Sequence, residues 1–269
     1  MLQVSSAMKG YAIAAKDGTI GTVDDFLVDQ ATWMMRWLVV DTGTWLTGRQ
    51  ALVHPSAIDH VDHGQRQIDV ALTHEQVEGS PDMGRDRPVS QQMQSGLYRY
   101  YGWDPLWNGG INGAGPYAGG LYGGSLFGAG MGATGLAERE RPYGSGRQGA
   151  DDGPALEESD PNLRSIAEIT KYHVHAADGS IGHVEDVLLD EPSWGVRYLV
   201  INTSNWWVGQ HVLISPYAIK EIDWPDRSIR LDITREKVKA SPSWNPADVI
   251  DGTFERRLHE HYGWPGHGW

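Results

Sequence analysis

An Asp-Thr-Gly triplet after an apolar run is the part of this sequence whose residue types most directly suggest chemistry. Asp41-Thr42-Gly43 follows the apolar residues 37–40 and precedes a tryptophan. Aspartic proteolysis uses a carboxylate in this setting, but it needs two carboxylates that share one proton, because adjacent like charges drive their pKa values apart. A hydrolase centred on Asp41 would therefore need a second such motif, or a homodimer that pairs two copies of Asp41.

An internal repeat shows what stands at the equivalent place. Residues 17–82 align with residues 178–243 without a gap and are identical at 27 of 66 positions. The triplet falls on Asn202-Thr203-Ser204, and asparagine can neither hold the charge nor act as the base. We therefore expect Asp41 and Asn202 to close a strand end by bonding to loop backbone, and we predict no catalytic residues.

Histidines are the second candidate for chemistry, as metal ligands. His173 and His175 alternate along an expected strand, so they point to one face, and His259, His261 and His267 gather near the C-terminus. Two imidazoles at this spacing can share a metal ion, but the sequence places no third ligand beside them. We expect solvated histidines and predict no metal and no cofactor.

Two tryptophan-containing loops are the candidate contact sites. Trp45-Leu46 and Trp206-Trp207 occupy equivalent turns of the two repeats. Large aromatic side chains are costly to expose and are favoured at protein interfaces. We therefore take Trp45, Leu46, Trp206 and Trp207 as candidate interaction residues. The alternative is that each loop covers the open end of its own unit.

Charge and composition limit the classes of partner and ligand that the chain is expected to bind. The formal net charge is -13, which disfavours nucleic acid and anionic membranes. The chain has no cysteine, so disulfides and thiolate-bound metals are excluded. The acidic pairs Asp24-Asp25 and Glu185-Asp186 have the chemistry to hold a cation, although we expect them to form a solvated strand face. We see no signal peptide and expect a cytoplasmic protein without stable membrane insertion.

The elements of each repeat unit are expected to be short strands. A hairpin with a type I′ turn is predicted at Asp17-Gly18 and again at Asp178-Gly179. About six short strands are expected within some 65 residues. A sheet of so few short strands avoids exposed edges by closing into a barrel. Thr73 and Thr234 are expected to cap a first helix. A second helix is expected to pack on the unit through two residues four positions apart: Leu97 with Tyr101, and Leu258 with Tyr262.

A glycine-rich segment separates the two units. Residues 105–153 contain 16 of the 34 glycines, and residues 105–137 carry no charge. Such a sequence offers too few large side chains to form a core or a convincing membrane span. We divide the chain into a first domain at 1–103, a flexible linker at 104–165 and a second domain at 166–269.

The repeated pattern resembles a known family. "DGxIGxVxDxLxD", "WxxRxLVxxT", a Trp-Gly loop, "PxAI" and a closing "SP" are similar to the PRC-barrel domain. This domain is known from the cytoplasmic part of the photosynthetic reaction-centre H subunit and from a ribosome-maturation factor. The resemblance implies a compact β-barrel that contacts other proteins or itself, and it implies no catalytic residues.

The sequence thus predicts a mainly β fold of two small closed β-barrels, each followed by short helices and joined by the glycine-rich linker. We expect a non-enzymatic bacterial protein that acts by protein–protein contact, with unknown protein partners and an intramolecular pseudo-dimer or a homo-oligomer as open arrangements. The alternative is a sensor that holds a small molecule or metal in a pocket between the two barrels.

Overall fold

The computed structural model describes residues 1–46, 49–81, 83–84, 89–103, 162–203, 210–246 and 248–266. Most of the predicted linker, residues 104–161, therefore lies outside the described residues. Leu163–Ser165, which the sequence analysis placed at the linker's end, form a strand. The described chain forms two units whose elements follow the same order, apart from one short strand of the first unit.

The first unit comprises twelve elements in the described chain. They are β1 (Leu2–Val4), α1 (Ser5–Met8), β2 (Ala12–Ala15), β3 (Gly18–Asp29), β4 (Met35–Asp41), β5 (Arg49–Val53), η1 (Pro55–Ala57), β6 (Ile58–Asp62), β7 (Gln67–Val70), α2 (His74–Glu78), β8 (Met83–Gly84) and α3 (Gln91–Tyr101).

The second unit repeats this order, except that an isolated bridge between His211 and Trp244 stands in the place of β8. Its elements are β9 (Leu163–Ser165), α4 (Ile166–Ile169), β10 (His173–Ala176), β11 (Gly179–Asp190), β12 (Gly195–Asn202), β13 (His211–Ile214), η2 (Pro216–Ala218), β14 (Ile219–Asp223), β15 (Ser228–Leu231), α5 (Arg235–Lys239) and α6 (Gly252–Tyr262). The offset of 161 positions, seen between Leu2 and Leu163, holds to within one residue for every pair of counterparts. The repeat therefore extends further toward the N-terminus than sequence identity indicated.

Each unit is built on one antiparallel-rich sheet. The hydrogen-bonded order is β6-β7-β2-β3-β4-β5-β8 in the first unit and β13-β12-β11-β10-β15-β14 in the second. The prediction of a mainly β fold with short helices is confirmed. The described residues show no pairing between the end strands of either sheet, so closure into barrels stays a prediction.

The local signals of the sequence explain most element boundaries. The hairpins at Gly18 and Gly179 form as expected, but positive φ occurs at these glycines and not at the preceding aspartates, so the predicted type I′ turn is wrong. Thr73 and Thr234 are the helix N-caps that the sequence indicated. The predicted helix contacts also form, because Leu97, Leu258 and Tyr262 are buried and Tyr101 packs against the same core.

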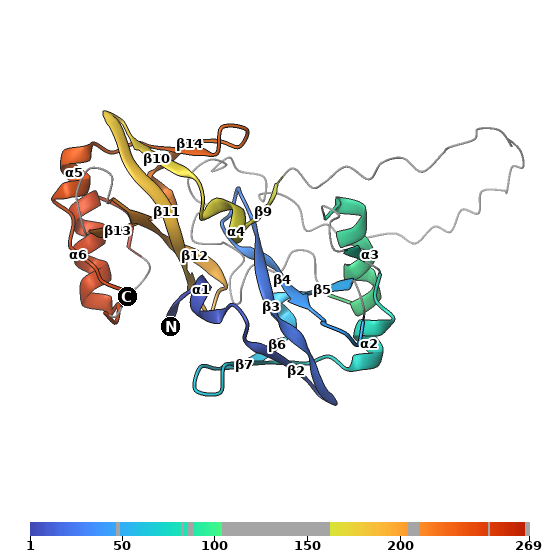
Figure 1. The fold of residues 1–269 in the computed structure, drawn as a ribbon. Helices are drawn as coiled ribbons and strands as arrows, with labels where there is room; N and C mark the ends of the chain where they lie inside the picture. The colour runs from blue at the N-terminus through green and yellow to red at the C-terminus, as the bar shows by residue number, and fades with distance from the viewer. Residues whose placement is uncertain are drawn as a thin grey trace, which may run out of the picture.

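The two units meet through their N-terminal segments. Strand β1 pairs with β11 of the second unit, and β9 pairs with β3 of the first unit. In Figure 1, α1 and α4 lie between the two sheets, while α2 with α3 and α5 with α6 lie at opposite ends of the molecule. Each unit therefore completes its partner's sheet with a segment of its own chain.

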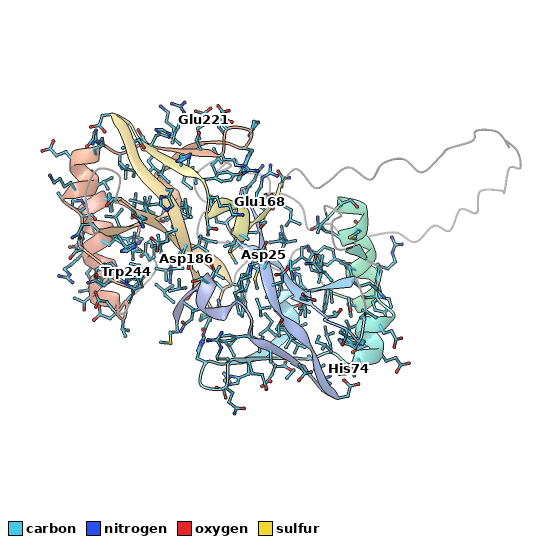
Figure 2. All side chains as sticks on the ribbon, viewed as in Figure 1. Asp25, His74, Glu168, Asp186, Glu221 and Trp244 are labelled. Atoms are coloured by element: carbon cyan, nitrogen blue, oxygen red, sulfur yellow. The ribbon has the colours of Figure 1, made fainter. Side chains whose placement is uncertain are left out.

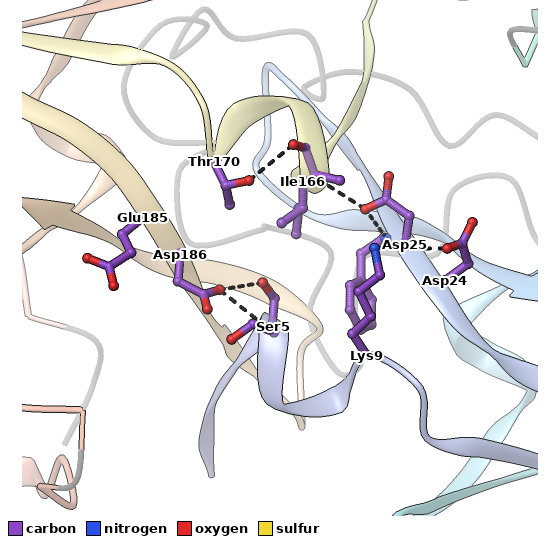
Figure 3. Close-up of a pocket in the computed structure, with 11 residues that line it drawn as sticks. Ser5, Lys9, Asp24, Asp25, Ile166, Thr170, Glu185 and Asp186 are labelled. Atoms are coloured by element: carbon purple, nitrogen blue, oxygen red, sulfur yellow. Dashed lines mark hydrogen bonds and ion pairs between the residues drawn. The ribbon is translucent and has the colours of Figure 1, made fainter.

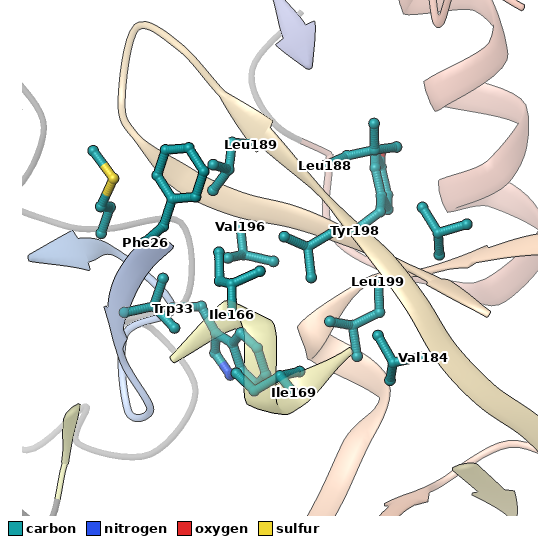
Figure 4. Packing of buried hydrophobic residues seen from close by; sticks show 14 of the residues in the cluster. Phe26, Trp33, Ile166, Ile169, Val184, Leu188, Leu189, Val196, Tyr198 and Leu199 are labelled. Carbon is teal, nitrogen blue, oxygen red and sulfur yellow. The ribbon is translucent and has the colours of Figure 1, made fainter. Parts of the chain in front are cut away.

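One hydrophobic core cluster runs through both units. Figure 4 shows Phe26 and Trp33 of the first unit beside Ile166, Ile169 and Val196 of the second. All five side chains are buried. Burying apolar surface on both sides of the junction stabilises the pairing of the units by the same hydrophobic effect that stabilises each core. No helix among the described residues is long and apolar enough to cross a membrane.

Candidate functional site

The junction between the two units gathers the two acidic pairs that the sequence analysis singled out, Asp24-Asp25 and Glu185-Asp186. Asp25 lies on β3 and Asp186 on β11, and each receives the N-terminal segment of the other unit. Figure 2 places both carboxylates near the middle of the molecule, far from His74 and Trp244.

Both aspartates accept hydrogen bonds from the segments that the two units exchange, β1–α1 and β9–α4; we call these the exchanged segments. Asp186 Oδ1 accepts the Ser5 hydroxyl at 2.5 Å and the Ser6 backbone N–H at 3.3 Å. Asp25 accepts the Ser165 hydroxyl on Oδ2 and the Ala167 backbone N–H on Oδ1 at 3.1 Å. Asp186 is only 7% exposed. The expectation that these acidic pairs form a solvated strand face is therefore wrong for Asp25 and Asp186.

The surroundings of Asp25 change the pKa of its carboxyl group. Burial raises the pKa of the Asp25 carboxyl above its ordinary value, and the hydrogen bonds from Ser165, Phe26 and Ala167 oppose that rise. A carboxyl with a raised pKa in the folded state binds its proton more tightly there than in the unfolded chain. Its contribution to folding is therefore most favourable at low pH, and it declines as the pH rises from the ordinary aspartate pKa through the folded-state pKa.

This linkage gives a pH-dependent prediction. Wild type should lose stability as the pH rises through that range, whereas Asp25→Asn should not, because asparagine does not titrate. The unfolding free energy of the variant relative to wild type should therefore increase as the pH rises. Asp25→Ala should cost roughly 1–3 kcal/mol at neutral pH, because it leaves buried donors without an acceptor. Urea titrations of both variants at several pH values measure these differences, and a pH-independent gap between wild type and Asp25→Asn would contradict the assignment.

A second reciprocal contact crosses the junction at the turns before β4 and β12. Trp33 and Trp194 have left-handed backbone, with φ of 56° and 55°. The Trp194 carbonyl accepts the Met35 N–H at 2.8 Å, and the Trp33 carbonyl accepts the Val196 N–H at 2.8 Å. This conformation costs free energy for a side chain as bulky as tryptophan. The buried rings and the paired backbone hydrogen bonds offset that cost.

A small pocket of about 140 Å³ lies at the centre of the junction (Figure 3). Residues equivalent in the repeat line it from both sides; they include Asp24 with Glu185, Asp25 with Asp186, and Lys9 with Thr170. Lys9 Nζ lies 3.9 Å from Asp24 Oδ1, and both groups are solvent-exposed, so this ion pair is weak. Glu185 instead contacts Asn202 and His211. The pocket is thus acidic, with a cationic side chain on one side only.

The rim of the junction is polar. His63 Nε2 hydrogen-bonds to Glu191 of the other unit. Arg164 donates from Nε to Gln30 Oε1 at 3.2 Å, while its guanidinium lies 4.2 Å from the ring centre of Trp224. These contacts fix the side-chain geometry around the exchanged strands.

Asp41 bonds to loop backbone as the sequence predicted, whereas the Asn202 amide donates to the Glu185 carboxylate. Asp41 Oδ1 accepts the Gly43 N–H at 2.9 Å, which closes an Asx turn. Thr42 Oγ1 lies 2.9 Å from the Arg49 carbonyl, and Thr203 Oγ1 lies 2.9 Å from the Gln210 carbonyl. Both threonines are buried. The pair that the repeats keep identical therefore ties the loop closed in each unit.

The tryptophan loop of the first unit lies on its own unit. Trp45 is 37% exposed, its Nε1–H donates to the Ile20 carbonyl at 2.7 Å, and its ring packs edge-on against His74. Leu46 is half-buried, and its carbonyl accepts the Arg49 N–H. This geometry matches the alternative in which the loop covers its own unit, with part of the indole ring left at the surface. Trp206 and Trp207 lie outside the described residues.

The candidate metal-binding histidines that the structure describes have separate roles. No group of three potential ligands assembles among the described residues. His259 is buried between the Tyr198 hydroxyl and the Pro265 carbonyl, and burial lowers its pKa. His261 contacts the Lys237 carbonyl. His173 is exposed on β10, His175 is half-buried, and His267 lies outside the described residues.

Sequence reasoning missed the exchanged segments themselves. Only Leu2 and Leu163 are identical between β1 and β9, so the repeat carries little signal there. The serine that reaches the aspartate is also displaced by one position, since Ser5 aligns with Ile166 while Ser165 aligns with Val4. Continuing the offset of 161 past the identical region would have been the usable signal.

Comparison with known families identifies one domain. A family model described as the PRC-barrel domain matches residues 162–238, which cover β9 through most of α5. No curated protein matches the chain. The matched range lies wholly in the second unit and begins with the segment that docks on the first.

Proposed function

We propose that this chain is a non-enzymatic interaction module made of two tandem PRC-type barrels. The observation that carries the proposal is the reciprocal docking of β1 on β11 and of β9 on β3. Two similar units that share a core present two similar surfaces at a set spacing. A partner that touches both surfaces gains avidity without any new kind of contact.

The family match and the role of the aspartates support this proposal. The PRC-barrel match covers the second unit from β9 through most of α5, and the repeat extends the same pattern to the first unit. Asp25, Asp186 and Asp41 all bond to backbone N–H groups within the chain, which is a structural use of a carboxylate. We assign the protein to the bacterial cytoplasm on the resemblance and the cysteine-free sequence.

The tryptophan loops are the proposed contact points for a protein partner. Trp45 leaves part of its ring at the surface, and aromatic side chains of this kind dominate interface energetics. In an affinity pull-down quantified by mass spectrometry, Trp45→Ala/Trp206→Ala should lose partners that wild type recovers. Val249→Ala removes a side chain that is 80% exposed and serves as the control that keeps them. Equal recovery of partners by all three proteins would show that the tryptophan loops do not bind them.

A second function, sensing of a small molecule, is supported by the pocket at the junction. The cavity is lined by polar groups of both units, as a ligand that reports on their pairing would require. Its volume of about 140 Å³ admits only a small ligand, below the usual range for cofactors. A short polyamine should raise the melting temperature of wild type more than that of Asp24→Asn/Glu185→Gln. An equal effect on both proteins would exclude the pocket.

A further inference from the structure

The contacts between the two units are self-complementary, as contacts across a two-fold axis are. In β1 on β11, Leu2 lies opposite Asp190; in β9 on β3, Leu163 lies opposite Asp29. Both residues of the first pair stand 161 positions from the residues of the second, since 163 − 2 and 190 − 29 are equal. The carbonyl contacts of Trp33 and Trp194 repeat in the same way. Each unit therefore offers the other the same strand pairing and the same carbonyl contact.

Nothing in these contacts depends on the two units belonging to one chain. The paired strands, the hydrogen bonds from Ser5 to Asp186 and from Ser165 to Asp25, and the carbonyl contacts of Trp33 and Trp194 each join residues 1–103 to residues 162–266. The second unit of another copy carries the same strand β11, the same Asp186 and the same β9–α4 segment. The covalent connection raises the local concentration of the tethered unit over that of a unit from another chain.

The junction also distinguishes unlike from like pairs of units. His63 meets Glu191, but the repeat equivalents of these residues are Trp224 and Gln30. Two first units would therefore face His63 with Gln30, and two second units would face Trp224 with Glu191. Neither like pair reproduces the His63–Glu191 hydrogen bond.

The pocket favours unlike pairs in the same direction. Lys9 is replaced by Thr170 in the second unit, so a pair of second units would bring Glu185 and Asp186 together twice without the Lys9 ammonium. A pair of second units would gain Arg164 beside Glu191 in place of Gln30. Of the two like pairs, the pair of second units therefore competes best with the unlike pair.

We propose that this surface binds a second copy of the same chain. The first unit of each copy pairs with the second unit of the other, and the product is a closed two-chain dimer in which both junctions are the one seen here within a single chain. Closure follows because every docking surface is used, so the exchange ends at two chains. The exchanged dimer forms where chains fold together at high concentration, since an intermolecular partner must compete with the tethered one.

The absence of cysteine makes the exchange measurable by disulfide trapping. Gln3 and Leu189 are Cα partners in the β1–β11 ladder, and facing positions of antiparallel strands lie within the span of a disulfide. Single variants Gln3→Cys and Leu189→Cys are unfolded, mixed, refolded at high or low protein concentration, and oxidised. The double variant in one chain shows that the geometry permits the bond.

The mixed single variants should give a disulfide-linked pair of chains joined between positions 3 and 189. Its yield should rise at least tenfold from low to high refolding concentration. Mixing Gln3→Cys with Val28→Cys, the first-unit equivalent of Leu189→Cys, reports pairs of first units. Mixing Leu189→Cys with Arg164→Cys, the second-unit equivalent of Gln3→Cys, reports pairs of second units. Both mixtures should give at most a tenth of that product.

Wild type provides a measurement that does not depend on any variant. After refolding at high concentration, light scattering should detect a two-chain species that is absent after refolding at low concentration. The proposal is overturned if wild type shows only single chains under both conditions. It is equally overturned if the like-pair mixtures yield as much product as the mixture of Gln3→Cys with Leu189→Cys.

Discussion

Trp33→Ala and Trp194→Ala are each expected to lower the free energy of unfolding by roughly 3–5 kcal/mol. Both indole rings are 5% exposed and belong to the core cluster that both units share. Removing either ring leaves a cavity at the junction, so the loss should shift one unfolding transition of the whole chain. Urea unfolding followed by circular dichroism measures the shift.

Glycine at the same positions gives a diagnostic comparison. Alanine keeps the strained left-handed backbone at φ of 56°, whereas glycine adopts it freely. Trp33→Gly should therefore be less destabilised than Trp33→Ala by about 1 kcal/mol, the reverse of the usual order. Greater stability of Trp33→Ala, or a separate transition for one half of the chain, would show that the turn does not carry the strain assigned to it.

Gly21→Ala and Gly182→Ala are expected to cost roughly 3 kcal/mol or more, as strained backbone and overpacking act together. A Cβ at Gly21 would lie 2.2 Å from the Asp41 carbonyl oxygen, and one at Gly182 would lie 1.9 Å from the Asn202 carbonyl oxygen. Both glycines also have positive φ, 154° and 143°. The obstacle is backbone of the neighbouring strand, which cannot rotate away as a side chain can.

Gly96→Ala is the matched control for this pair. Gly96 lies inside α3, and a Cβ there would meet only the Pro81 side chain at 3.8 Å, an ordinary contact. Alanine in a helix interior should stabilise the protein by about 0.5–1 kcal/mol. Thermal unfolding should therefore move the melting temperature in opposite directions for Gly96→Ala and Gly21→Ala. A small loss at Gly21 would mean that β3 and β4 approach each other less closely than described.

The contacts at Gly21 and Gly182 explain why Asp41 of the first unit can stand as Asn202 in the second. The contact with Gly21 is made by the backbone carbonyl of Asp41, and the contact with Gly182 by that of Asn202. The backbone oxygen is the same for either side chain, so Asp and Asn are both accepted. Thr42 and Thr203 close the loop in both units, which is why this residue does not change.

Local patterns predicted the elements because their causes are local. The capping threonine at position 73 and the helix pairs Leu97 with Tyr101 and Leu258 with Tyr262 depend on residues a few positions apart, and the structure agrees. The turn at Asp17-Gly18 was placed correctly but given the wrong type. Turn type depends on the register of the two strands, and β2 and β3 shift register between Ile13 and Ala14.

The junction could not be predicted in the same way. Whether β1 completes its own sheet or that of the other unit depends on contacts between residues more than 180 positions apart, such as Ser5 with Asp186. No periodicity within a strand encodes that choice. The sequence predicted Asp25 and Asp186 on a solvated strand face because the groups that bury them come from the opposite unit.

The most direct test of the account is to cut the chain between its units. A protease site is inserted in the predicted linker, between residues 105 and 153, and the folded protein is treated with the protease. If the exchanged segments hold the units together, the two pieces should remain associated, and light scattering should give the mass of the intact chain at micromolar concentration. Prompt separation of the pieces into two folded units would contradict the central claim that each unit is completed by a segment of the other.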